Sequence, residues 1–95
     1  MFIAQLHYQK SFEEVQQHVE AHRSYLGTLY DTGKLIVSGP KTDKTGGLIL
    51  FATTDRQEVE NIIAQDPYHT LGLAKYELLE FHPVKYDPKF SNLYL

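Results

Sequence analysis

The apolar residues of this chain recur with two periods, and the order in which those periods follow one another restricts the folds available to it. Residues 2–8 alternate between two sides, with the period of two that a strand requires. Between residues 12 and 29, apolar side chains instead recur every three or four positions, which predicts one face of a helix. That stripe consists of Phe12, Val15, Val19, His22, Leu26 and Leu29.

The same order is then repeated. Residues 34–39 and 48–53 predict two strands joined by a polar turn, to which we assign Gly46 and Gly47. Val59, Ile62 and Ile63 form the inward face of a second helix, and residues 72–82 supply a last strand. The order strand, helix, strand, strand, helix, strand predicts a ferredoxin-like α+β domain, a βαββαβ antiparallel sheet with two helices on one face.

Local signals support the two helices. Ser11 and Glu14 have the spacing of a capping box, in which each side chain satisfies a free backbone N–H at a helix start. Gly33 can adopt the left-handed conformation that closes the first helix near residues 30–32. Pro67 disfavours helical geometry at Asp66, so the second helix is expected to stop there.

The sheet face without helices is expected to be hydrophobic. Residues 48–52 show no alternation and both sides of residues 78–81 are apolar, so a single copy would leave apolar surface in water. Pairing of two sheets face to face would bury it, and we therefore expect a homodimer. We divide the chain into a domain of residues 1–84 and a C-terminal tail of residues 85–95, whose Tyr86, Phe90, Leu93, Tyr94 and Leu95 are too apolar for simple solvation.

Composition excludes several classes of function. With 95 residues the chain has room for one core. The net charge is −3 and the basic residues are scattered, so nucleic acid is not an expected partner. The longest apolar run, residues 48–52, is far short of a membrane span, and the start of the chain lacks a signal-peptide pattern. Cysteine is absent, which is compatible with a reducing compartment; we expect a soluble, cytoplasmic protein without a cofactor motif.

His22 is an ionisable residue inside an otherwise apolar helical stripe. It is either a core histidine whose ring packs between Val19 and Leu26, or a general acid–base group, since imidazole exchanges protons near neutral pH. Asp66 continues the inward stripe of the second helix, although Asp-Pro is also a common turn signal. If both helices cover one sheet face, the two side chains can meet at its end.

The sequence offers three other arrangements. Ser38 could complete a Ser–His–Asp set, but the residues around it do not form a nucleophile turn. His18 and His22 are one helical turn apart, as metal ligands can be, yet no clear third ligand accompanies them, and we assign no metal site. Asp31, nine residues after His22, would be about 13 Å away along one straight helix, which is too far to pair with it. His69 could lie near the pocket.

Several of these residues together resemble the YciI-like (YCII-related) domain family. They are His22 in the first helix, Asp31-Thr-Gly-Lys-Leu leading to Ser38-Gly-Pro, and Asp66-Pro-Tyr after the second helix. The resemblance extends to about His82. It implies a ferredoxin-like fold paired into a dimeric α+β barrel, similar to muconolactone isomerases and related small monooxygenases.

The resemblance also implies an acid–base site of a histidine and an aspartate, which fall on His22 and Asp66. The leading hypothesis is a cofactor-independent lyase or isomerase acting on a small cyclic or aromatic metabolite, with Ser38, the backbone at Gly39 and Tyr68 binding a carbonyl or hydroxyl of the substrate. The alternative is a non-catalytic dimeric module that binds a small molecule. Many relatives carry Leu directly after the histidine and Arg three residues before it, where this chain has Arg23 and Val19, and such positions are expected to shape the pocket.

Overall fold

The computed structural model describes the backbone of residues 1–94 and the side chains of residues 1–91, so Leu95 and the side chains of the predicted tail residues Leu93 and Tyr94 lie outside the described part. Within that part, the strands are β1 (Phe2–Tyr8), β2 (Leu35–Pro40), β3 (Gly46–Phe51) and β4 (Ala74–Glu80). They form an antiparallel sheet in the order β2-β3-β1-β4.

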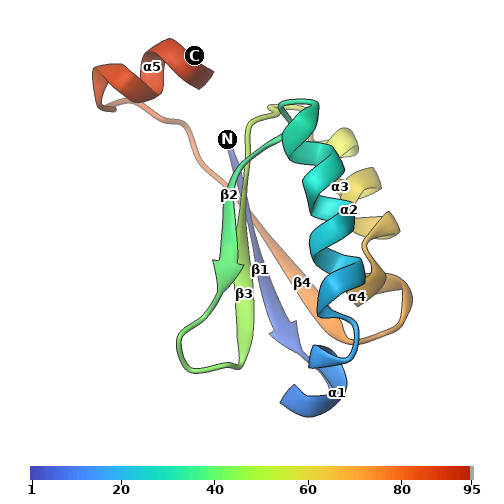
Figure 1. Cartoon of the computed structure of the whole chain (residues 1–95). Coiled ribbons are helices and arrows are strands. Elements are labelled where there is room, and N and C mark those ends of the chain that lie inside the picture. The colour runs from blue at the N-terminus through green and yellow to red at the C-terminus, as the bar shows by residue number, and fades with distance from the viewer. Residues whose placement is uncertain (95) are drawn as a thin grey trace.

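One face of the sheet is covered by helices, as Figure 1 shows. The helices are α1 (Phe12–Gln16), α2 (Val19–Asp31), α3 (Arg56–Gln65), the short α4 (Pro67–Thr70) and α5 (Pro88–Tyr94), of which α2, α3 and α4 lie against the sheet. The predicted ferredoxin-like α+β fold is confirmed. No helix in the described residues is long and apolar enough to cross a membrane.

The core lies between the sheet and the helices. Phe2, Ala4 and Leu6 point from β1 toward the helices and are buried, as the period of two predicts. Val15 from α1 and Val59 from α3 are buried against them, and Phe51 fills the same layer from β3. The alternation within β1 therefore decides which face of the sheet receives the helices.

The first helix differs from its prediction, because the chain breaks it into α1 and α2 at Gln17 and His18. The apolar stripe continues through the break, so its spacing could not reveal the interruption. Ser11 accepts a hydrogen bond from the Glu14 N–H at 3.2 Å, which is the Ser11 half of the predicted capping box and starts α1. The break places His22 in the first turn of α2.

The assignment of Gly46 and Gly47 to the turn is wrong. Both residues lie in β3, and a Cβ atom at Gly46 would collide with the backbone carbonyl of Leu6 in β1. Glycine is therefore required here by the close approach of two strands rather than by a turn.

The other sheet face carries a continuous apolar row. Val37 is paired with Leu50, Leu50 with Ile3, and Ile3 with Leu79, so the row crosses all the strands of the sheet in register. Val37 is 57% and Leu79 49% exposed in the single chain. The C-terminal helix α5, which the sequence did not predict, lies apart from the sheet and the other helices (Figure 1).

Candidate active site

His22 and Asp66 meet between α2 and the start of α4, although 44 positions separate them along the chain. The His22 Nδ1 atom lies 2.8 Å from the Asp66 Oδ1 atom. A carboxylate at this position accepts a hydrogen bond from the Nδ1–H group of His22. The other ring nitrogen, Nε2, therefore faces away from Asp66. The structure therefore brings together the two residues selected from the sequence, whereas their catalytic role stays a prediction.

Asp66 is buried and accepts hydrogen bonds at both carboxylate oxygens. Besides His22, the backbone N–H of Tyr68 donates to Oδ1 at 3.0 Å, and the Tyr76 hydroxyl donates to Oδ2 at 2.7 Å. The first of these bonds makes Asp66 the N-cap of α4, with Pro67 in the first turn. Asp66 therefore has both of the roles that the sequence suggested: it caps a helical turn, and it is the partner of His22.

The His22 ring is fixed on a second side by Tyr68. The two rings are stacked, with centroids 3.8 Å apart and planes inclined by 2°, and Tyr8 meets Tyr68 edge to face at 6.2 Å. Because one face of the imidazole is covered and Nδ1 is bonded, the ring has little freedom to rotate. Its side chain keeps only 12% of its surface exposed.

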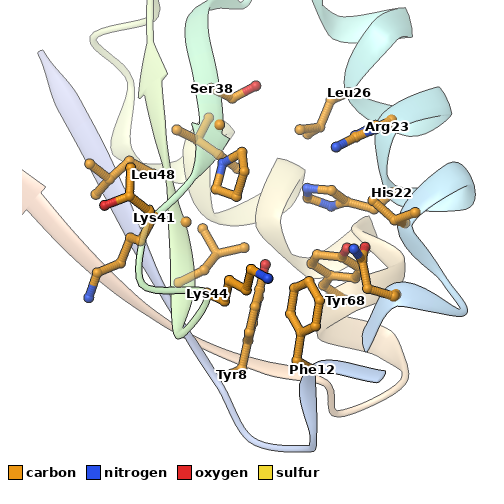
Figure 2. A pocket seen from close by; sticks show the side chains of 18 residues that line it. Tyr8, Phe12, His22, Arg23, Leu26, Ser38, Lys41, Lys44, Leu48 and Tyr68 are labelled. Carbon is orange, nitrogen blue, oxygen red and sulfur yellow. The ribbon is translucent and has the colours of Figure 1, made fainter. Parts of the chain in front are cut away.

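That remaining surface opens onto a cavity of about 460 Å³ between α2 and the ends of β2 and β3. Figure 2 shows the imidazole pointing into it. Tyr68, Ser38 and Gly39, chosen from the sequence as binding residues, also line the cavity, whereas Asp66 lies behind His22 and does not. The arrangement presents a proton-carrying ring to a ligand and keeps its carboxylate partner out of contact with that ligand.

Burial changes the titration of the surrounding phenols. It raises the pKa of Tyr68 to about 12, with Tyr8 and Asp66 adding to the rise and Arg23 counteracting it. Burial also raises the pKa of Tyr76, and the Asp66 carboxylate adds to this because it repels a phenolate and accepts the bond that the hydroxyl donates. Both hydroxyl groups therefore keep their protons at neutral pH.

Other sequence candidates are placed elsewhere. The Ser38 hydroxyl lies 2.6 Å from the Tyr30 hydroxyl and bonds to it rather than to His22. His69 packs edge to face on Tyr76 at 5.9 Å and lines a separate hollow, so it is not part of the lining of this cavity. Among the described residues, no group of three or more His, Cys, Asp or Glu side chains is arranged to hold a metal ion.

Sequence reasoning missed Tyr76 and Tyr8. Tyr76 is paired in register with Leu6, which places it on the helix-covered face beside Asp66, but this depends on a pairing between strands distant in sequence. Tyr8 ends the alternating pattern of β1 and could have been found, since it follows Phe2, Ala4 and Leu6 on the same side.

The sequence of this chain matches the model of one protein family. The model of the YCII-related domain matches residues 1–82. The chain belongs to the YCII-related domain family. The match covers every strand and the helices that build the cavity, and it ends before α5. No curated protein shows significant similarity to this family member.

A solved structure shares the fold of this YCII-related chain. It is the 5-chloro-2-hydroxyhydroquinone dehydrochlorinase (TftG) from Burkholderia phenoliruptrix AC1100, in complex with 2,5-dihydroxybenzoquinone. The TM-score is 0.70 and the identity 22%, over 86% of this chain and 94% of the other. At that identity the likeness is one of fold.

Proposed function

We propose that this protein is a cofactor-independent lyase or isomerase that moves protons on a small hydroxylated ring. The observation that carries the proposal is the 2.8 Å contact between His22 and the buried Asp66 at the wall of a cavity. A histidine held in this way can accept a proton at Nε2 and return it, while the carboxylate stabilises the imidazolium formed in between. Asp66 acts as a positioning residue.

The reaction can be written with the chain's own groups. Nε2 of His22 removes a hydroxyl proton from the ring, the oxygen electrons form a C=O bond, and the displaced ring electrons bind the same proton at a neighbouring carbon. This is an isomerisation to the keto form. If that carbon bears a leaving group X, and a second hydroxyl lies on a ring C=C bond adjoining it, His22 then removes the proton of that hydroxyl. A second C=O bond forms, the C=C bond shifts to the carbon that bears X, and X⁻ leaves with its bonding pair, so the net change is loss of HX.

The shared fold with a dehydrochlorinase of a hydroquinone supports this choice of reaction and ring. The cavity adds a second argument. At about 460 Å³ it has the volume of small-molecule sites in general, and Ser38, the backbone at Gly39 and the aromatic wall of Tyr68 offer polar and stacking contacts for a hydroxylated ring.

The test is proton exchange, because it requires no knowledge of the natural leaving group. The protein is incubated in D₂O with 1,2,4-trihydroxybenzene, and loss of ring C–H signals is followed by NMR. We expect catalysed exchange that His22→Asn reduces at least about a hundredfold. His69→Asn is the matched control, since His69 lies outside the cavity. Exchange that survives His22→Asn would end the proposal.

The same assay separates the alternative, a non-catalytic binding module. A module would bind the ring without accelerating exchange, and His22→Asn would change affinity alone. The His22 ring is held by Asp66 and Tyr68 yet open to the cavity, and this favours the catalytic reading over a polar core residue.

We infer further that two copies of the chain pair through the bare sheet face. The row of Val37, Leu50, Ile3 and Leu79 supplies a central apolar strip, as interface cores require. Residues 85–95 are a tail appended to the domain of residues 1–84. Val84 is 83% and Tyr86 50% exposed at this junction.

A further inference from the structure

Two cations are directed into the cavity from opposite sides. Figure 2 shows the Arg23 side chain reaching from α2 toward the cavity and Lys44 entering from the turn between β2 and β3, whereas Lys41 is turned away. Among the described residues that line the cavity there is no aspartate or glutamate. A chain with a net charge of −3 thus has a cavity whose lining is cationic.

Neither cation is neutralised by the protein. Within residues 1–91, Arg23 and Lys44 form no ion pair with a carboxylate, whereas Arg56 contacts both Glu60 and Glu80 at 3.7 Å. Arg23 is close enough to the phenols of Tyr8 and Tyr68 to counteract the rise in pKa that burial gives them. Its charge is therefore felt inside the cavity, near His22.

The turn holds Lys44 in an unfavourable backbone conformation. Its φ angle is 64°, in the left-handed region that disfavours a residue with a Cβ atom. The Lys44 Nζ atom lies 5.2 Å from the centre of the Phe12 ring, and this cation–π contact fixes the side chain across the cavity mouth. Glycine would suit the backbone better, but it would remove the charge.

Building on the proposed function, we propose that the cavity takes its ligand as an anion. The ligand is a hydroxylated ring whose anionic oxygen, a carboxylate or an ionised hydroxyl, lies between Arg23 and Lys44. The apolar side chains of Phe12, Val19 and Leu26 line the remaining wall and accept the ring. The same cations would stabilise the oxyanion that forms when His22 removes a hydroxyl proton.

Binding of matched probes tests this without turnover. Calorimetry compares 2,5-dihydroxybenzoate with 2,5-dihydroxybenzamide, which differ by one charge at nearly equal size. A second arm compares 2,5-dihydroxybenzoquinone, whose acidic hydroxyls are ionised at neutral pH, with uncharged hydroquinone. We expect the anion of at least one pair to bind about tenfold more tightly, because a charged contact contributes about this much at a half-exposed site. The arm that responds identifies the anionic oxygen.

Single variants locate the charge. Arg23→Gln and Lys44→Gln are each expected to reduce the preference for the anion to about threefold or less. Lys10→Gln removes the same charge from an exposed residue outside the cavity lining and is expected to leave it unchanged. Equal binding of both members of each pair, no binding of any probe at millimolar concentration, or a preference that survives both variants would each overturn the proposal.

The two proposals fail in different ways. His22→Asn removes no charge from Arg23 or Lys44 and is expected to keep the preference for the anion. If deuterium exchange does not depend on His22 but the anion preference responds to Arg23→Gln, the proposed reaction is wrong and the anion site stands.

Discussion

Asp55 and Asp66 cap successive helices with the same geometry, since each carboxylate accepts a hydrogen bond at 3.0 Å from the backbone N–H two residues later. The difference lies in what else they bind. Asp55 is exposed, whereas Asp66 is buried and also binds the side chains of His22 and Tyr76. One chain therefore contains a plain helix cap and a cap that holds a site together.

This pair allows the site's contribution to stability to be measured. Asp66→Ala is expected to lower the free energy of unfolding by about 3 kcal/mol, because two buried side-chain partners lose their acceptor along with the cap. Asp55→Ala removes a cap alone and is expected to cost about 1 kcal/mol. Urea denaturation of both variants gives the comparison. Equal losses would mean that the buried bonds contribute nothing net.

Asp66→Asn is expected to separate structure from catalysis. The amide oxygen can still accept from His22 and Tyr68, and its NH₂ group can donate to the Tyr76 hydroxyl, so the fold is retained. The negative charge that stabilises an imidazolium is lost. We expect His22-dependent deuterium exchange to fall about a hundredfold, while the preference for anionic probes is kept. Unchanged exchange with an intact fold would show that Asp66 has no catalytic consequence.

The buried tyrosines predict a loss of stability at alkaline pH. Burial raises the pKa of Tyr68 to about 12 and also raises the pKa of Tyr76. A tyrosine in the unfolded chain loses its proton near pH 10, so above that pH the unfolded state binds fewer protons than the folded state, and stability falls as pH rises. Below about pH 10 this contribution is fully present.

Urea unfolding between about pH 8 and pH 11 measures this dependence. Tyr76→Phe is expected to make the decline less steep, even though the variant is less stable at neutral pH through loss of its bond to Asp66. The control is Tyr86→Phe, in the exposed segment after β4. A slope that does not respond to Tyr76→Phe would assign the decline to other groups.

The sequence predicted what depends on local periodicity and left out what depends on pairing between distant segments. The strands, the capping Ser11 and the stop at Asp66 follow from neighbouring residues. The meeting of His22 and Asp66 could be anticipated because both lie on inward helical stripes. Tyr76 could not, since its place beside Asp66 requires the register of β4 against β1.

The roles of Gly46 and Arg23 also could not be predicted from the sequence, because they depend on residues that are close only in the folded chain. Gly46 looks like a turn residue because glycine pairs are common in turns, and only the nearness of the Leu6 carbonyl shows why glycine is needed. Arg23 is a departure from relatives in the sequence, and only the tertiary structure shows that it lies across the same cavity from Lys44. The places of these two residues in the fold therefore had to come from the tertiary structure.

The apolar row on the bare sheet face is the surface through which we propose that two copies of the chain pair. Leu79 stands at one end of the row and is 49% exposed, whereas Leu71, in the turn before β4, is 52% exposed and lies outside the sheet. In a symmetric dimer each substitution occurs twice, so Leu79→Glu would bury two carboxylates against apolar side chains. We expect Leu79→Glu to sediment as a monomer at micromolar concentration in analytical ultracentrifugation, and Leu71→Glu to remain dimeric. Because the row faces away from the cavity, the monomeric variant should keep the anion preference, and a dimer that tolerates Leu79→Glu would place the interface on another surface.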